Sequence, residues 1–186
     1  MNTGLLVLRI VVGSLLIGHG TQKLFGWFGG YGLGGVGDWF DSLGFRPGRA
    51  MAAVAGLGEA GGGLLLLLGF LNPLAAAAIL GTMLVASSTH LPKIWASEGG
   101  LELPFILAAV AVMYGFTGPG RYSLDKALDW HTSGVRWGLA VAAAGVLGAL
   151  SVVLYARHTL RNTAPAAEAY PVEPELTADS RVDLNR

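Results

Sequence analysis

Cysteine is absent from this sequence of 186 residues, and charged residues make up only 13% of it. The first absence excludes disulfide exchange, thiolate metal sites and a cysteine nucleophile within the chain. The second sets the chain apart from soluble domains, in which roughly 25% of residues are charged. The formal net charge is zero, so no excess of basic residues indicates a nucleic-acid partner. Apolar residues, at 53%, and 29 glycines fill the sequence instead.

Five apolar segments approach the roughly 20 helical residues needed to cross the hydrocarbon core of a bilayer. Loop signals rich in Gly and Pro separate them, such as Gly118-Pro119-Gly120 after the fourth. A chain that crosses lipid must satisfy its own backbone hydrogen bonds. The sequence therefore predicts an all-α integral membrane helical bundle, with a four-helix core of two hairpins and a fifth transmembrane helix at its edge. The predicted segments lie near residues 4–25, 50–70, 73–91, 101–117 and 134–156.

The connecting segments and the C-terminal tail are expected to lie outside the hydrocarbon core. Residues 26–45 are rich in Gly and aromatics, which favours a loop and a short interfacial helix at headgroup level. Residues 123–130 resemble a second short helix, with Ser123 as its N-cap. The tail has three prolines, five acids and one aromatic residue, a composition typical of disorder. The resulting divisions are a core at 1–132, an additional helix at 133–156 and a disordered tail at 157–186.

Polar residues recur at one end of the predicted bundle. The first helix ends with His19, Gln22 and Lys23, and the third ends near His90 and Lys93. The segment after each of these helices carries one acid in an apolar setting, Glu59 and Glu102 respectively. Ionisable residues within a membrane cost about 2.5–3.5 kcal/mol each on insertion scales, so they usually mark a function. We expect Glu59 to face the bundle interior within reach of His19, His90 or Lys23.

Each of these residues also has a purely structural interpretation. Glu59 could form a structural pair with a His or Lys of the bundle, and the histidines could be satisfied interfacial residues. Lysines near helix ends often extend to the headgroups, and we expect the same of Arg9 near the other membrane face. No H-x-x-H, H-x-x-x-H or E-x-x-H spacing occurs on one helix, so the sequence specifies no metal site.

Four separate segments resemble the DoxX family of small bacterial membrane proteins over about residues 5–130. In order they are GHGTQKLFGWFGG, GLGEAGGGLLLLLGF, THLPK and GPGRYSLD. The resemblance implies a four-helix core in the bacterial envelope, so the fifth helix and tail here extend beyond the family pattern. It also implies a redox setting, because some relatives take part in quinone-linked sulfur-compound oxidation and others in assemblies that handle oxidative stress. The family's recurring polar residues fall on His19, Lys23, Glu59, His90, Lys93, Arg121, Tyr122 and Asp125.

Together these observations favour a membrane subunit of a redox complex that handles a quinone or protons and acts as an oxidoreductase only with partners. Its partners would be the lipid bilayer, soluble or membrane redox proteins and, in one arrangement, a second copy of the chain. Two other hypotheses remain open, a non-catalytic scaffold that anchors redox enzymes and a small-molecule carrier. The hypothesis assigns catalytic roles to Glu59, His19 and His90, and quinone binding to Lys23, Lys93, Gln22 and Glu102.

The location follows from the resemblance and from the positions of basic residues. The family indicates a multi-pass protein of the bacterial cytoplasmic membrane. More Lys and Arg residues lie at the membrane side that contains Lys23 and Arg157 than at the side that contains Arg121. The positive-inside rule then predicts an external N-terminus and a cytoplasmic C-terminal tail.

Overall fold

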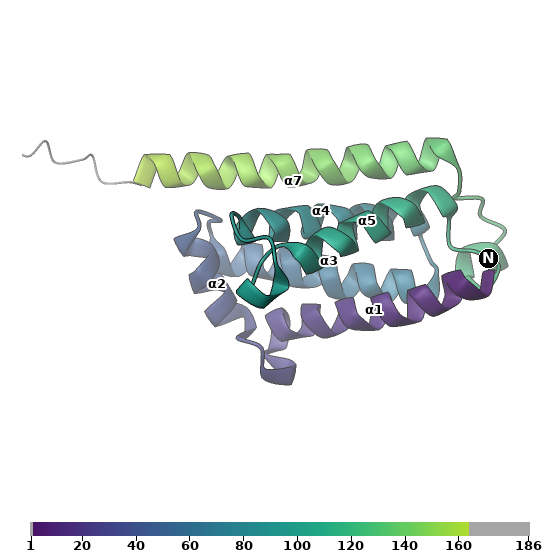
Figure 1. Ribbon diagram of the computed structural model, residues 1–186, viewed down its shortest axis with the longest axis horizontal. Coiled ribbons are helices and arrows are strands. Elements are labelled where there is room, and N and C mark those ends of the chain that lie inside the picture. The colour runs from purple at the N-terminus through teal and green to yellow at the C-terminus, as the bar shows by residue number, and fades with distance from the viewer. Residues whose placement is uncertain (1, 164–186) are drawn as a thin grey trace, which may run out of the picture.

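The structure, a computed structural model, describes residues 2–163, and every regular element within that range is helical. Five longer helices run side by side along the bundle, and short helices connect them at the two ends (Figure 1). The predicted all-α bundle is thereby confirmed. The longer helices are α1 (Asn2–Phe25), α3 (Gly48–Leu68), α4 (Asn72–His90), α5 (Glu102–Thr117) and α7 (Val135–Thr163). The short ones are η1 (Trp27–Gly29), α2 (Gly32–Ser42), η2 (Ala96–Glu98) and α6 (Leu124–Ala127).

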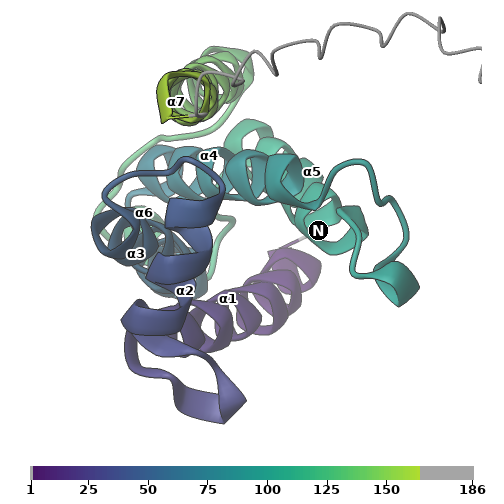
Figure 2. The same ribbon diagram turned by 90° about the vertical axis from the view of Figure 1, so that its left-hand side faces the viewer.

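Four of these helices, α1, α3, α4 and α7, are long and apolar enough to cross a membrane. The fifth expected span, α5, has only 16 residues, or about 24 Å at 1.5 Å per residue. This is less than the roughly 30 Å of a hydrocarbon core, because the residues before Glu102 form the η2 loop rather than another helical turn. α5 nevertheless packs lengthwise beside α4, as expected of a hairpin (Figures 1 and 2).

Glycines let α1 and α3 pack with their backbones in close contact. A Cβ at Gly13 would lie 2.8 Å from the carbonyl oxygen of Gly63, and a Cβ at Gly63 would lie 2.8 Å from that of Gly13. Further along the same interface, a Cβ at Gly20 would collide with the backbone of Ala60. Small residues of this kind let membrane helices approach closely and gain van der Waals contact. The first hairpin, α1 with α3, therefore holds a fixed axial register.

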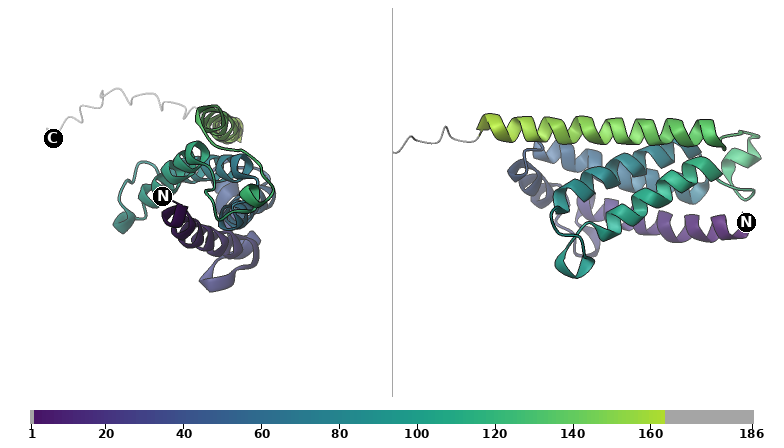
Figure 3. Two further views of the ribbon diagram at one scale, coloured as in Figure 1. Left: turned by 90° about the vertical axis from the view of Figure 1, so that its right-hand side faces the viewer. Right: turned by 45° about the horizontal axis from the view of Figure 1, so that its top comes forward.

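α7 covers α4 and α5 and is held along its length (Figures 1 and 3). Gly138 faces the ring of Phe116 on α5, and Gly145 faces Leu80 on α4. The helix continues to Thr163, seven residues beyond the predicted end at 156. Residues 164–186 of the predicted disordered tail lie outside the described residues.

Arg9 is buried, with 2% of its surface exposed, and the expectation that it extends to the headgroups was wrong. Its guanidinium donates hydrogen bonds to four carbonyl oxygens, those of Leu66, Leu67, Pro119 and Tyr122. The planar guanidinium of Arg presents five N–H donors, so one side chain can bind carbonyl oxygens both at the end of α3 and in the loop before α6. Arg9 therefore joins α1 to two other chain segments at the N-terminal end of the bundle.

Asp125 is fully buried and caps a helix that is distant in sequence. One carboxylate oxygen accepts the N–H of Leu71 at 2.8 Å, and the other accepts that of Asn72 at 2.9 Å. These are free N–H groups at the start of α4, the place where carboxylates stabilise helices. Ser123 caps α6 as predicted, by accepting the N–H of Lys126 at 3.2 Å.

Candidate functional site

An ion pair joins α1 to α3 inside the opposite end of the bundle, where α1 and α4 end and α3 and α5 begin. Lys23 Nζ lies 2.6 Å from Glu59 Oε2, and Glu59 is only 3% exposed. The close packing of Gly20 against Gly56 and Ala60 explains the contact. Lys23 follows Gly20 by three residues and Glu59 follows Gly56 by three, so both side chains leave the same interface. The predicted interior position of Glu59 is confirmed, and Lys23 is its partner.

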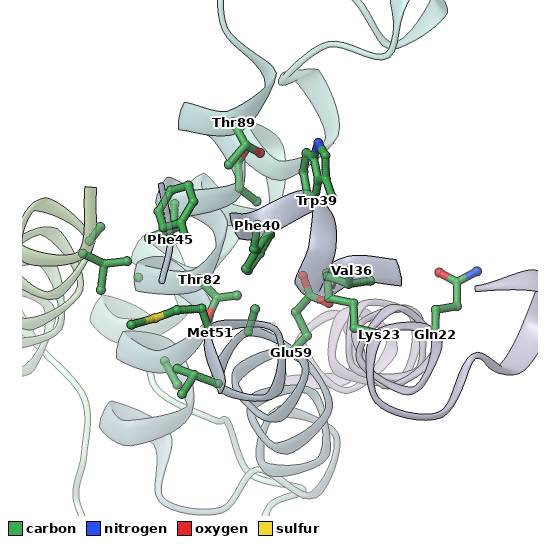
Figure 4. A pocket seen from close by; sticks show the side chains of 18 of the residues that line it. Gln22, Lys23, Val36, Trp39, Phe40, Phe45, Met51, Glu59, Thr82 and Thr89 are labelled. Carbon is green, nitrogen blue, oxygen red and sulfur yellow. Dashed lines mark hydrogen bonds and ion pairs between the residues drawn. The ribbon is translucent and has the colours of Figure 1, made fainter. Parts of the chain in front are cut away.

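A cavity of about 850 Å³ extends from this ion pair towards α7. Figure 4 shows Lys23 and Glu59 at one side of it, Thr82 and Met51 near its middle, and α7 at the far side. Most of its wall is apolar, and its polar lining side chains include Gln22 beside the ion pair and Thr82, Thr89 and His90 on α4. Its other lining residues include Val36, Trp39 and Phe40 of α2, Val85 and Thr89 of α4, and Ala144, Gly145, Gly148, Ala149 and Val152 of α7.

A second, smaller cavity of about 120 Å³ also contacts Lys23 and Glu59. His19 and His90 line it, together with apolar side chains of α1, α4 and α5. A water molecule takes about 30 Å³ of liquid volume, so this space has room for a few waters. Two histidines, a lysine and a carboxylate therefore surround one small chamber, and the ion pair borders both cavities.

His90 makes a hydrogen bond that determines which ring nitrogen carries a proton. Its Nδ1 lies 2.8 Å from the carbonyl oxygen of Gly99, which can only accept. Nδ1 therefore carries the hydrogen, and in the neutral ring Nε2 is an acceptor. The η2 loop thus orients the imidazole, which lines both cavities.

The structure does not bring all of the predicted site residues to the cavities. Gln22 lines the larger cavity, and its side-chain amide donates to the carbonyl oxygen of Phe28. Lys93 is exposed and lines neither cavity, because α4 ends at His90 and Pro92 cannot continue the helix. Glu102 also lies outside both, where its carboxylate accepts the backbone N–H of Ala96. The two hairpins carry similar polar residues in sequence, but only the histidines of both hairpins line a cavity. Lys93 and Glu102 do not take positions equivalent to those of Lys23 and Glu59.

For several lining residues, nothing in the sequence indicated that they would border a cavity. Trp39 and Phe40 were expected only at the interface, and both border the larger cavity. Gly148 was one of many small residues in α7, and nothing set it apart. Its position becomes informative only when α7 is placed against α4. A Cβ at Gly148 would meet no atom within 4 Å.

The chemistry available at this site is proton transfer and hydrogen bonding beside an apolar chamber. Lys23 offers three N–H donors, of which one contacts Glu59. Imidazole and carboxylate groups can exchange protons with ordered water. Within residues 2–163, no group of three or more His, Asp or Glu side chains is arranged to hold a metal ion.

Comparison with known proteins shows that part of this chain is similar to one family. Residues 4–91, from α1 to the residue after α4, match the DoxX family model. The match contains His19, Lys23, Glu59 and His90 and ends before α5 and α7. The fourth resembling segment, GPGRYSLD, therefore lies outside the matched region. No curated protein and no solved structure matches the chain.

Proposed function

We propose that this multi-pass membrane protein, whose residues 4–91 match the DoxX family model, binds a quinone and handles its protons as a subunit of a redox complex. The single observation that carries the proposal is the position of the Lys23–Glu59 ion pair. It borders both a large apolar cavity and a small chamber lined by His19 and His90. Such a complex would act in sulfur-compound or oxidative-stress metabolism at the bacterial cytoplasmic membrane, with the C-terminal tail in the cytoplasm.

The dimensions and lining of the larger cavity fit a quinone. Pockets of about 300–1,000 Å³, mostly apolar with a few placed polar groups, hold ligands of drug size, and this one measures about 850 Å³. A quinone has a flat ring with polar oxygens at its edge. Its carbonyl oxygen would accept one of the free N–H donors of Lys23, while the aromatic side chains of α2 contact the ring.

Each polar residue of the chain has a distinct role in this proposal. A bound quinone supplies chemistry that takes up two electrons and two protons. Lys23 orients the carbonyl oxygen, and the carboxylate of Glu59 relays protons to it. His19 and His90 pass protons through the small chamber, where water can connect them to Glu59. The electrons come from a partner redox protein, because this chain has no cysteine for thiol redox chemistry and no recognised cofactor motif.

Fluorescence quenching tests binding without a partner. Trp39 lines the cavity, so a variant in which the other four tryptophans are replaced by Phe should lose fluorescence when menaquinone binds. In that background Glu59→Gln should weaken binding about tenfold, which corresponds to 1.4 kcal/mol. Glu98→Gln is the matched control, because Glu98 is an exposed acid outside both cavities. Equal affinity in all three proteins would refute the role of Glu59.

Activity in native membranes tests the proton path. Glu59→Gln and His19→Ala should lower quinone reduction at least tenfold in membranes that contain the partner enzyme, while the amount of assembled complex stays the same. Unchanged activity in both variants would refute the proposed path.

A scaffold that anchors redox enzymes is the second candidate function. Large apolar side chains remain exposed around η1 and η2, at the same end as the ion pair. They include Phe25, Trp27, Phe28, Tyr31, Ile94 and Trp95. Replacing Trp27 and Phe28 with Ser should release a partner enzyme from the membrane if they dock it. Glu59→Gln should leave that association intact, which separates the two candidates.

A further inference from the structure

We propose that the larger cavity selects a quinone with a long isoprenoid tail, and that α7 forms the binding surface for the tail. This inference rests on the proposed quinone site and adds the class of ligand and the residues that select it. Three features of the cavity carry it: the separation of its charged side chains from its apolar α7 wall, its length, and its opening beside α7.

The charged side chains of the cavity lie at one side of it, and its α7 wall is apolar. Lys23 and Glu59 lie on the side formed by α1 and α3, as Figure 4 shows. The α7 wall is built from Ala144, Gly145, Gly148, Ala149 and Val152, none of which has a polar side chain. A compact polar ligand would gain nothing from that second wall. A molecule with a polar head and a hydrocarbon chain matches both, because it buries apolar surface at one end and hydrogen-bonds at the other.

The cavity is also longer than a ring requires. Its lining on α4 extends from Ala77 to His90, a span of 13 residues or about 20 Å along the helix. A bicyclic quinone ring occupies only part of that length. The remaining space continues past the side chains of α2 towards α7, and apolar side chains such as Met51 and Val85 border it.

The α7 side of the cavity reaches the lipid-facing surface. Ala144 and Gly148 line the cavity and are also exposed. A full isoprenoid tail is longer than the cavity, so it needs an exit into the bilayer. Gly148 leaves that route open, because a Cβ there would meet no atom within 4 Å. A larger side chain at this position would point into free space and narrow the exit.

α7 is held firmly enough to act as a wall. Towards its C-terminal end the backbone of Ala156 contacts Gly44 in the loop after α2, and Tyr155 donates a hydrogen bond to the carbonyl oxygen of Arg46. Towards its beginning Gly138 packs on Phe116. The family match ends at residue 91, and α7 lies beyond it. The residues proposed to bind the quinone ring therefore lie within the matched region, and the residues proposed to select the tail lie outside it.

Two ligands with the same ring separate tail binding from ring binding. Menaquinone carries the isoprenoid tail, and menadione is the same naphthoquinone ring without it. In the background where Trp39 is the sole tryptophan, Gly148→Leu should weaken menaquinone binding at least tenfold and menadione binding less than twofold. Ala144→Leu, one helical turn earlier, should do the same and provides a second variant. Gly61→Leu is the control, because Gly61 also has open space at its Cβ position and lines neither cavity.

The outcomes distinguish this inference from the function on which it rests. If Gly148→Leu and Ala144→Leu leave menaquinone affinity unchanged, or weaken both ligands equally, tail selection by α7 is refuted while the quinone site stands. If the unmodified cavity binds neither ligand, the proposed function is refuted and the inference fails with it. If Gly61→Leu weakens menaquinone binding as much as Gly148→Leu does, the assignment of tail binding to this cavity is refuted.

Discussion

Replacing Lys23 with Met should destabilise the bundle because it leaves the Glu59 carboxylate buried without a partner. Removing one partner of a fully buried ion pair costs about 3–5 kcal/mol, and an exposed pair is worth about 0–1 kcal/mol. The side chain of Lys23 is 24% exposed and that of Glu59 is 3% exposed. We therefore expect Lys23→Met to lower the free energy of unfolding by about 2–3 kcal/mol, between those limits.

Replacing Glu59 instead of Lys23 should cost less stability, and the variant with both changes tests the reason. Glu59→Gln leaves the ammonium of Lys23, which can reach water, so we expect a loss of about 1 kcal/mol. Because Lys23→Met and Glu59→Gln together bury no unpaired charge, the double variant should be about as stable as Glu59→Gln alone.

SDS titration in bicelles, followed by tryptophan fluorescence, measures all four free energies of unfolding. The cycle should show coupling of about 2–3 kcal/mol. Strictly additive losses, or equal losses from the two single changes, would refute the reasoning that a buried carboxylate depends on Lys23.

Three further predictions use the same unfolding assay. Arg9→Lys keeps the charge but cannot reach all four carbonyl oxygens that Arg9 contacts, so we expect a loss of about 3 kcal/mol; a loss under 1 kcal/mol would contradict the structural role. Asp125→Ala removes the acceptor of the N–H groups of Leu71 and Asn72, and should cost about 2 kcal/mol. Gly63→Val places a side chain against the α1 backbone and should cost about 1–3 kcal/mol, whereas Gly61→Val, which faces open space, should cost much less.

The helical architecture could be predicted from the sequence because the rule that creates it is local. Each long apolar run must satisfy its own backbone in lipid, and only a helix does so within one segment. The five predicted segments therefore correspond to α1, α3, α4, α5 and α7 within about two residues at most boundaries. The end of α7 was missed, because Arg157 and the polar residues after it give no apolar signal although the backbone continues as a helix.

The candidate site could be predicted only in part. Glu59, His19 and His90 stood out because an ionisable residue in an apolar segment is costly wherever it lies. Lys93 resembled Lys23 by sequence spacing alone, and the end of α4 at His90 separated it from the cavities. The buried roles of Arg9 and Asp125 depend on partners more than 50 residues away, which spacing along one chain does not reveal.

The sequence by itself determined that this chain forms membrane helices and which ionisable residues are costly to place within them. Both properties depend on side chains and their neighbours along the chain. The tertiary structure decided which of those residues meet. The glycine contact between α1 and α3 brings Lys23 to Glu59, and α7 forms the far wall of the cavity. Such contacts arise from the packing of surfaces distant in sequence, so only the arrangement of the helices turns a set of costly residues into one site.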